Sequence, residues 1–154
     1  EIDKVFPDEY FFIMVGGGDL MDIVVEKINL YFDKKNFFCL GNYSHPEKIL
    51  TLSHFLINTS VIEGMPLTII EALAINVPVI AASIGAIGEI IINGFNGWLL
   101  DKNPSAENYI EAINKSREQN IYLHLRANTR ASVADKYSSK RMAKQYEEIF
   151  LNKK

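Results

Sequence analysis

Two carboxylates, Glu63 and Glu71, lie in a long stretch of chain without positive charge. Residues 49–100 contain no lysine and no arginine, so a nearby salt bridge can compensate neither acid. Glu71 stands among isoleucine, leucine and alanine, and we therefore expect much of its helix to be buried. A buried carboxylate needs hydrogen-bond donors, which would be backbone amides, a distant cation or the hydroxyl groups of a ligand. The spacing alone equally allows Glu71 to bond local backbone and Glu63 to be simply exposed.

Between the two acids, Gly64 and Pro66 predict a loop that runs into a helix. Glycine lets the backbone turn tightly or approach a ligand closely, and proline is favoured at the first turn of a helix. The free N–H groups and the positive dipole end of such a helix start attract anions. A phosphate group held there would lie beside carboxylates that can accept hydrogen bonds from sugar hydroxyls. This combination favours a nucleotide sugar over a bare nucleotide as the ligand.

The elements that must position these residues follow from the spacing of apolar runs. Continuous apolar runs, which indicate strands buried on both faces, occupy residues 10–15, 37–40, 55–57, 77–82 and 98–100. Helical patterns lie between them, over residues 20–32, 46–52, 66–75 and 87–92. Asn76 falls where the third of these helices must end in a left-handed residue, which asparagine tolerates. The alternation predicts an α/β fold, with a Rossmann-like parallel sheet flanked by helices.

The last third of the chain carries no predicted strand. Helical patterns cover residues 105–118, 121–135 and 138–151. We therefore expect residues 1–154 to form a single domain, with the sheet in residues 1–104 and the C-terminal helices in residues 105–154.

Four loops are expected at one edge of the sheet, because parallel α/β sheets bind ligands at the carboxyl ends of their strands. These loops are residues 16–18, 41–44, 60–65 and 83–87. Three of them place glycine beside small or polar residues, as a phosphate cradle requires. The first is not a dinucleotide fingerprint, because Met21 takes the position of its third glycine and Asp19 would repel a pyrophosphate.

Composition excludes several classes of protein. The chain has 154 residues, of which 48% are hydrophobic and 23% charged, as in an ordinary globular domain and unlike a disordered chain. A single cysteine excludes a disulfide framework, and no cysteine–histidine spacing predicts a metal site. The net charge of −3 argues against a nucleic-acid partner. Charges and a proline interrupt the apolar residues 69–92, which therefore indicate buried core rather than a membrane span.

The motifs occur in an order that resembles a known family. They are Gly16-Gly17-Gly18, Gly41, Glu63-Gly64-Met65-Pro66, Glu71-Ala72, Pro78-Val79-Ile80-Ala81, Gly85, Glu89-Ile90-Ile91 and Asn96-Gly97. Over residues 5–150 the chain resembles the C-terminal, donor-binding domain of GT-B glycosyltransferases of group 1, the GT4-like family. It departs from the family pattern at Ala86 and Gly88, where glycine and proline are commoner.

The resemblance implies retaining transfer of a sugar from a nucleoside-diphosphate sugar to an acceptor, in the biosynthesis of a polysaccharide or glycoconjugate. It implies a catalytic role for Glu63 at the hydroxyls of the transferred sugar, and a contact between Glu71 and the donor ribose. The other donor-binding residues that it implies are Gly17, Gly41, Tyr43, Ser60, Gly64, Met65, Pro66 and Leu67. Among these, Tyr43 belongs to the loop against the base. No metal and no other cofactor is expected.

The resemblance also implies that residues 1–154 are an N-terminally truncated part of a larger enzyme. The family has an upstream strand and helix whose arginine and lysine clamp the diphosphate, and an N-terminal domain that holds the acceptor. We therefore expect weak donor binding and no turnover by the chain itself. The expected location is the cytoplasm, or the inner face of a membrane through the missing part of the enzyme. The alternatives are a domain like a nucleotide-sugar 2-epimerase of the same architecture and a non-enzymatic interaction domain.

Overall fold

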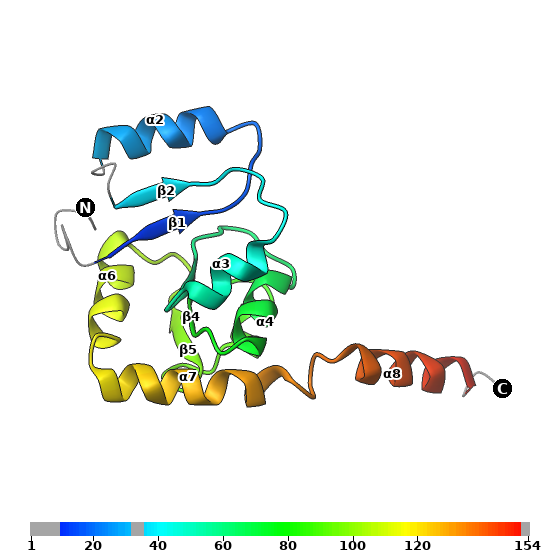
Figure 1. Cartoon of the computed structure of the whole chain (residues 1–154). Coiled ribbons are helices and arrows are strands. Elements are labelled where there is room, and N and C mark those ends of the chain that lie inside the picture. The colour runs from blue at the N-terminus through cyan, green and yellow to red at the C-terminus, as the bar shows by residue number, and fades with distance from the viewer. Residues whose placement is uncertain (1–9, 32–35, 152–154) are drawn as a thin grey trace. The chain divides into compact units, whose positions relative to one another are not determined.

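The computed structural model describes residues 10–31 and 36–151 (Figure 1). The chain divides into two compact units, Glu1–Pro46 and Glu47–Lys154, and each is described by itself. Helices and strands alternate along the chain up to residue 100, and every described strand pair is parallel. The predicted α/β class is therefore confirmed. The strands form two hydrogen-bonded sets, one in each unit, a pairing that apolar runs do not specify.

In the described residues of the first unit, two short strands pair with each other and a helix connects them. Strand β1 (Phe12–Met14) lies parallel to β2 (Phe37–Cys39), and helix α2 (Met21–Tyr31) connects them. The last residue of the predicted helix 20–32 is outside the described residues. Burial of these strands on both faces is a wrong prediction, because Ile13 of β1 and Phe38 of β2 are each 44% exposed. One helix cannot cover both faces of a strand pair.

The second unit is built on a three-stranded parallel sheet in the order β3-β4-β5. These strands are β3 (Leu56–Asn58), β4 (Val79–Ala82) and β5 (Gly97–Leu100). The helices that precede or join them are α3 (Pro46–Leu52), α4 (Leu67–Ala74) and α5 (Ile87–Ile90). All four residues of β4 are buried, so burial on both faces is confirmed for this central strand.

The core of the second unit joins this sheet to its helices. Ile69 and Leu73 of α4 are fully buried in one cluster with Val79 of β4 and Ile87 of α5. The predicted end of α4 is also confirmed, because Asn76 has the left-handed φ of 65°. This turn sends the chain from the helix directly into the buried strand β4. In the described part of the chain, no helix is long and apolar enough to cross a membrane.

Three helices follow the sheet, as the sequence predicts. They are α6 (Ala106–Lys115), α7 (Gln119–Val133) and α8 (Ser139–Leu151). The Asn108 side-chain oxygen accepts the Ser105 backbone N–H over 2.9 Å, which caps the start of α6. Helix α7 packs against α4, and α6 contacts β5. None of the residues of α8 is buried.

Candidate functional site

The acidic loop, residues 60–65, leaves the carboxyl end of β3 and leads into α4. Its first backbone N–H, that of Ser60, donates to the side-chain oxygen of Asn58 over 3.1 Å. A side chain that bonds the backbone two residues ahead forms an Asx turn, which sets the direction of the loop as it leaves the strand. Glu63, in the middle of the loop, is half-buried.

The loop after β4, residues 83–87, contacts the acidic loop near the C-terminal end of that loop. The Ala86 N–H donates to the Gly64 carbonyl oxygen over 2.9 Å. Gly85 has a left-handed φ of 50°, and a Cβ at this position would overlap the Glu63 carbonyl oxygen. The prediction that these two loops share the carboxyl edge of the sheet is confirmed. In this structure residues 83–87 contact the acidic loop itself.

The start of α4 leaves backbone donors beside the acidic loop. Pro66 is the N-cap, with φ −74° and ψ 108°, and Leu67 is the first helical residue. The Pro66 carbonyl accepts the Ile69 N–H over 3.2 Å, whereas the N–H groups of Leu67 and Thr68 donate to no acceptor among the described residues. The helix start therefore offers the amides that an anion site needs.

One expectation about the two acids, the burial of Glu71, does not agree with the structure. The sequence predicts that Glu71 is buried, and this prediction is wrong because the side chain is exposed. Helix α4 buries Ile69, Ala72 and Leu73, and a residue two positions from Ile69 lies about 200° around the helix axis, on the opposite face. Neither Glu63 nor Glu71 forms an ion pair with any residue that the structure describes. Both carboxylates are therefore free to accept hydrogen bonds from a ligand.

The first unit carries three of the predicted site residues. The Gly16 N–H donates to the Gly41 carbonyl over 2.8 Å, which places the loops after β1 and β2 side by side. A Cβ on Gly17 would lie 2.7 Å from the Asn42 side-chain oxygen, so a larger residue at position 17 would displace the Asn42 side chain. Gly41 has a left-handed φ of 61°, and the Tyr43 ring is 41% exposed. Gly17 and Gly41 thus form one loop pair within this unit.

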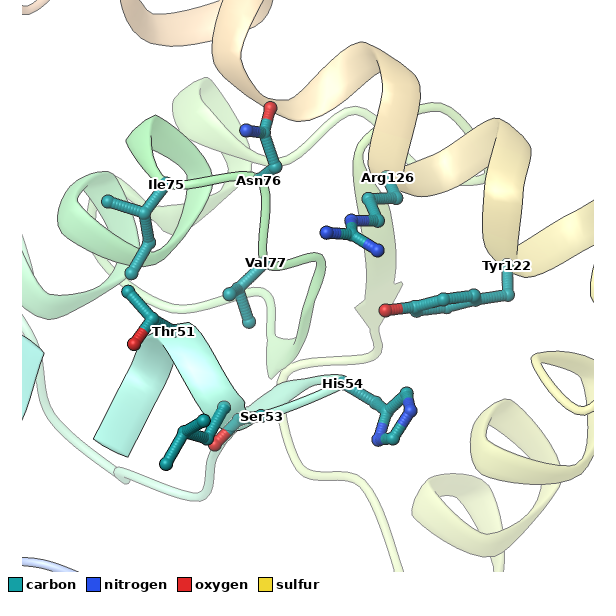
Figure 2. A pocket seen from close by; sticks show the side chains of 9 residues that line it. Thr51, Ser53, His54, Ile75, Asn76, Val77, Tyr122 and Arg126 are labelled. Atoms are coloured by element: carbon teal, nitrogen blue, oxygen red, sulfur yellow. The ribbon is translucent and has the colours of Figure 1, made fainter. Parts of the chain in front are cut away.

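A separate small hollow lies at the amino-terminal side of β3 and β4 (Figure 2). Its volume is about 130 Å³, and it is lined by Thr51, Leu52, Ser53, His54, Ile75, Asn76, Val77, Tyr122 and Arg126. Figure 2 shows the Arg126 guanidinium and the Tyr122 hydroxyl directed into it. Helices α3 and α4 end here, and helix C-termini carry negative partial charge, which favours the guanidinium and opposes a phosphate. The hollow is also much smaller than ligand sites of several hundred Å³.

Three residues that contact predicted site residues, one in the first unit and two in the second, were not themselves among the predictions. Asn58 directs the acidic loop, the Asn42 side chain lies against Gly17, and Gly85, which has no side chain, makes room for the Glu63 carbonyl. An asparagine directly after an apolar run is a signal for a turn, so Asn58 could have been found from the sequence. The contacts of Asn42 and Gly85 join distant segments and leave no local pattern. Among the described residues, no group of three or more His, Cys, Asp or Glu could hold a metal ion.

Comparison with known sequences supplies the family. Residues 4–148 match the family described as Glycosyl transferases group 1. The chain belongs to this family. The match spans the acidic loop, α4 and all five described strands, so the predicted resemblance is confirmed at the level of the family.

Curated relatives of this group 1 domain are longer proteins. This chain is 26% identical over 139 residues to N-acetyl-alpha-D-glucosaminyl L-malate synthase of Bacillus anthracis. The match covers 90% of this chain and 36% of that protein. The chain is 26% identical over 153 residues to UDP-Gal:alpha-D-GlcNAc-diphosphoundecaprenol alpha-1,3-galactosyltransferase of Escherichia coli, covering 97% of this chain and 38% of that protein. The chain thus spans little more than a third of these relatives.

Solved structures share the fold. HepE of Anabaena, solved with UDP-glucose, has a TM-score of 0.86 at 21% identity over 97% of this chain and 43% of its own. The pneumococcal O-GlcNAc transferase GtfA, solved with UDP and GlcNAc, has a TM-score of 0.82 at 20% identity over 96% of this chain and 30% of its own. The group 1 domain therefore has the Rossmann-like architecture found within GT-B enzymes.

Proposed function

We propose that this group 1 domain binds the donor of a retaining glycosyltransferase, a nucleoside-diphosphate sugar, and that the base of this donor is uracil. The observation that carries the proposal is the acidic loop. Two carboxylates without ionic partners flank the start of α4, where the N–H groups of Leu67 and Thr68 are free. The names of two similar structures include UDP, which supports the choice of base.

Each part of the site suits one part of such a donor. The diphosphate takes the amide donors and the positive dipole end at the start of α4, which also stabilises charge on the leaving group. The exposed Glu71 carboxylate accepts from the ribose hydroxyls, and Glu63 accepts from hydroxyls of the transferred sugar. The family resemblance separately assigns Tyr43, in the first unit, to the base. The two acids therefore report on different parts of the donor.

The proposal needs no metal at this site, because the helix start carries part of the diphosphate charge. Residues 49–100 supply no lysine or arginine for the rest of that charge. We therefore expect affinity in the millimolar range for the chain itself. Sugar transfer by the whole enzyme, and the identity of a hexose as the transferred sugar, are parts of the same proposal.

The test is ligand-observed NMR of the chain with UDP, GDP, ADP and UDP-glucose. UDP should bind best, and Glu71→Gln should weaken both UDP and UDP-glucose at least about tenfold, since hydrogen bonds to a charged group are lost. Glu63→Gln should weaken UDP-glucose and leave UDP unchanged. The matched control is Asp135→Asn, which neutralises an exposed carboxylate distant in the chain from the acidic loop.

Two results would contradict the proposal. One is equal, weak binding of all nucleotides that the Glu71→Gln and Asp135→Asn variants lower alike, as a non-enzymatic interaction domain predicts. The other is a loss of UDP binding in Glu63→Gln as large as in Glu71→Gln, because the two acids would then not contact separate parts of the donor.

A further inference from the structure

Asn58 is the point where the acidic loop leaves the sheet, and it is bonded twice. It is the last residue of β3, in register with Ala81 of β4. Its side-chain oxygen accepts the Ser60 N–H over 3.1 Å. Its backbone carbonyl accepts the hydroxyl of Tyr109 over 3.2 Å, across 51 residues of sequence. Movement of the Asn58 peptide group would therefore move the first residue of the loop.

Tyr109 is placed rigidly enough to hold that peptide group. Its side chain is 9% exposed and lies on the buried face of α6 with Ala112 and Ile113. Burial also raises the pKa of the Tyr109 hydroxyl, so it remains a donor well above neutral pH. The hydroxyl therefore acts as a fixed donor from the helix layer toward the end of the strand.

A second bond fixes α6 against the sheet at its other end. The Trp98 indole N–H of β5 donates to the Ser116 hydroxyl over 2.7 Å, and Ser116 is the C-cap of α6. The same hydroxyl donates to the Ala112 carbonyl over 2.8 Å. A helix tied to β5 at its C-cap and to β3 through Tyr109 can neither slide nor rotate freely over the sheet.

We propose that Tyr109 is a positioning residue for the acidic loop, acting through Asn58 on the placement of Glu63. This proposal rests on the proposed function of that loop. Tyr109 is assigned no contact with the donor. Its hydroxyl orients the Asn58 peptide, the Asn58 side chain then orients Ser60, and the Ala86–Gly64 bond holds the far end of the loop.

The test compares Tyr109→Phe with Tyr122→Phe in the full chain. Both variants remove one tyrosine hydroxyl and keep the ring, but the Tyr122 hydroxyl points into the small hollow at the opposite edge of the sheet (Figure 2). In Tyr109→Phe, the backbone amide NMR signals of residues 60–64 should shift, and their hydrogen exchange should accelerate. Affinity for UDP-glucose should fall about fivefold, an effect the size of one lost hydrogen bond, because Glu63 is assigned to the hydroxyls of the transferred sugar. Affinity for UDP alone should stay unchanged. Tyr122→Phe should leave these amide signals and the affinity for UDP-glucose unchanged.

A pair of Asn58 variants tests the hydrogen bond between the Ser60 N–H and the Asn58 side chain. Asn58→Asp keeps an acceptor for the Ser60 N–H and should retain the amide shifts and the UDP-glucose affinity of the wild type. Asn58→Ala should reproduce the Tyr109→Phe spectrum in residues 60–64. Unchanged amide signals of residues 60–64 in Tyr109→Phe would overturn the positioning role, whatever the measured affinity for UDP-glucose. Shifted amides in a chain that binds no nucleotide would support positioning and contradict the proposed function.

Discussion

The N–H of Ala86 donates to the carbonyl oxygen of Gly64 over 2.9 Å, which joins the loops after two neighbouring strands. Both loops follow parallel strands, so both emerge at the same edge of the sheet. The bond leaves the Glu63 side chain between two fixed points, the Asx turn at Ser60 and the contact at Gly64. The carboxylate is thereby held on a constrained backbone.

Gly85→Ala should disrupt this contact between loops. The left-handed φ of 50° and the overlap of a Cβ with the Glu63 carbonyl both penalise any side chain here. We expect a loss of at least about 2 kcal/mol in the free energy of unfolding, measured by urea denaturation, together with weaker UDP binding.

Gly88→Ala is the matched control for that substitution. A Cβ at Gly88 would meet Ser83 Oγ at 3.5 Å, which is ordinary contact, and the residue lies within α5. Because alanine is a better helix former than glycine, stability should stay the same or rise by up to about 1 kcal/mol. Equal losses in the two variants would contradict the role assigned to Gly85.

Asn96 links the segment before β5 to α7 from a fully buried position. Its side-chain N–H groups donate to the Ile90 carbonyl (3.0 Å) and the Ser132 hydroxyl (2.8 Å), and its oxygen accepts the Ile92 N–H (2.8 Å). Asn96→Asp would bury a negative charge. It would also place a carboxylate oxygen, instead of the amide N–H, against the Ile90 carbonyl. We expect the free energy of unfolding to fall by about 2–4 kcal/mol at pH 7.

The control for Asn96 is Asn93→Asp. The Asn93 side chain is exposed, and its oxygen accepts the Leu99 N–H over 3.1 Å, a bond that aspartate can also accept. Its effect in the same urea experiment should stay within about 0.5 kcal/mol. A comparable loss in both variants would contradict the assignment of this loss in the free energy of unfolding to the buried hydrogen bonds of Asn96.

Alkaline pH should reveal the burial of Tyr109. Because burial raises the pKa of this hydroxyl above its ordinary value of 10.0, the folded chain retains a proton that the unfolded chain releases. The resulting stability is fully present below pH 10 and is lost as the pH rises through the pKa of the folded state. Urea midpoints measured from pH 8 to pH 11 should fall less steeply in Tyr109→Phe than in the wild type, and parallel curves would contradict this prediction.

The Glu111–Lys115 pair should show the opposite dependence on pH. The Lys115 ammonium lies 2.8 Å from the Glu111 carboxylate, and this hydrogen bond holds the pKa of Glu111 below its ordinary value of 4.5. Its contribution to stability is present above that ordinary value and is lost as the pH falls through the pKa of the folded state. In an NMR titration, Lys115→Gln should raise the pKa of Glu111, whereas Lys102→Gln should leave it unchanged.

Local pattern accounts for much of what the sequence predicts correctly. The continuous apolar run at 77–82 indicates a strand buried on both faces, and β4 is such a strand. Asn76 follows the apolar helix and takes the left-handed turn that ends it. These features depend on neighbouring residues, whose conformational preferences act within a few positions of the chain.

Glu71 marks the point where local pattern fails. Its apolar neighbours predict burial, but the direction of a side chain depends on which face of α4 meets the sheet and α7. In a helix as short as α4, the sequence pattern alone does not specify which face is buried. The tertiary packing of Ile69 and Leu73 decides it and leaves the carboxylate exposed.

By itself, then, the sequence determined the alternation of strands and helices, the family, and a candidate anion site between two acids. Only the tertiary structure decided that Gly85 makes room for Glu63, and that Tyr109 bonds the end of a strand 51 residues earlier. The physical reason is that such contacts form between segments distant in sequence. Their partners are selected by the packing of the whole core, which no local spacing records.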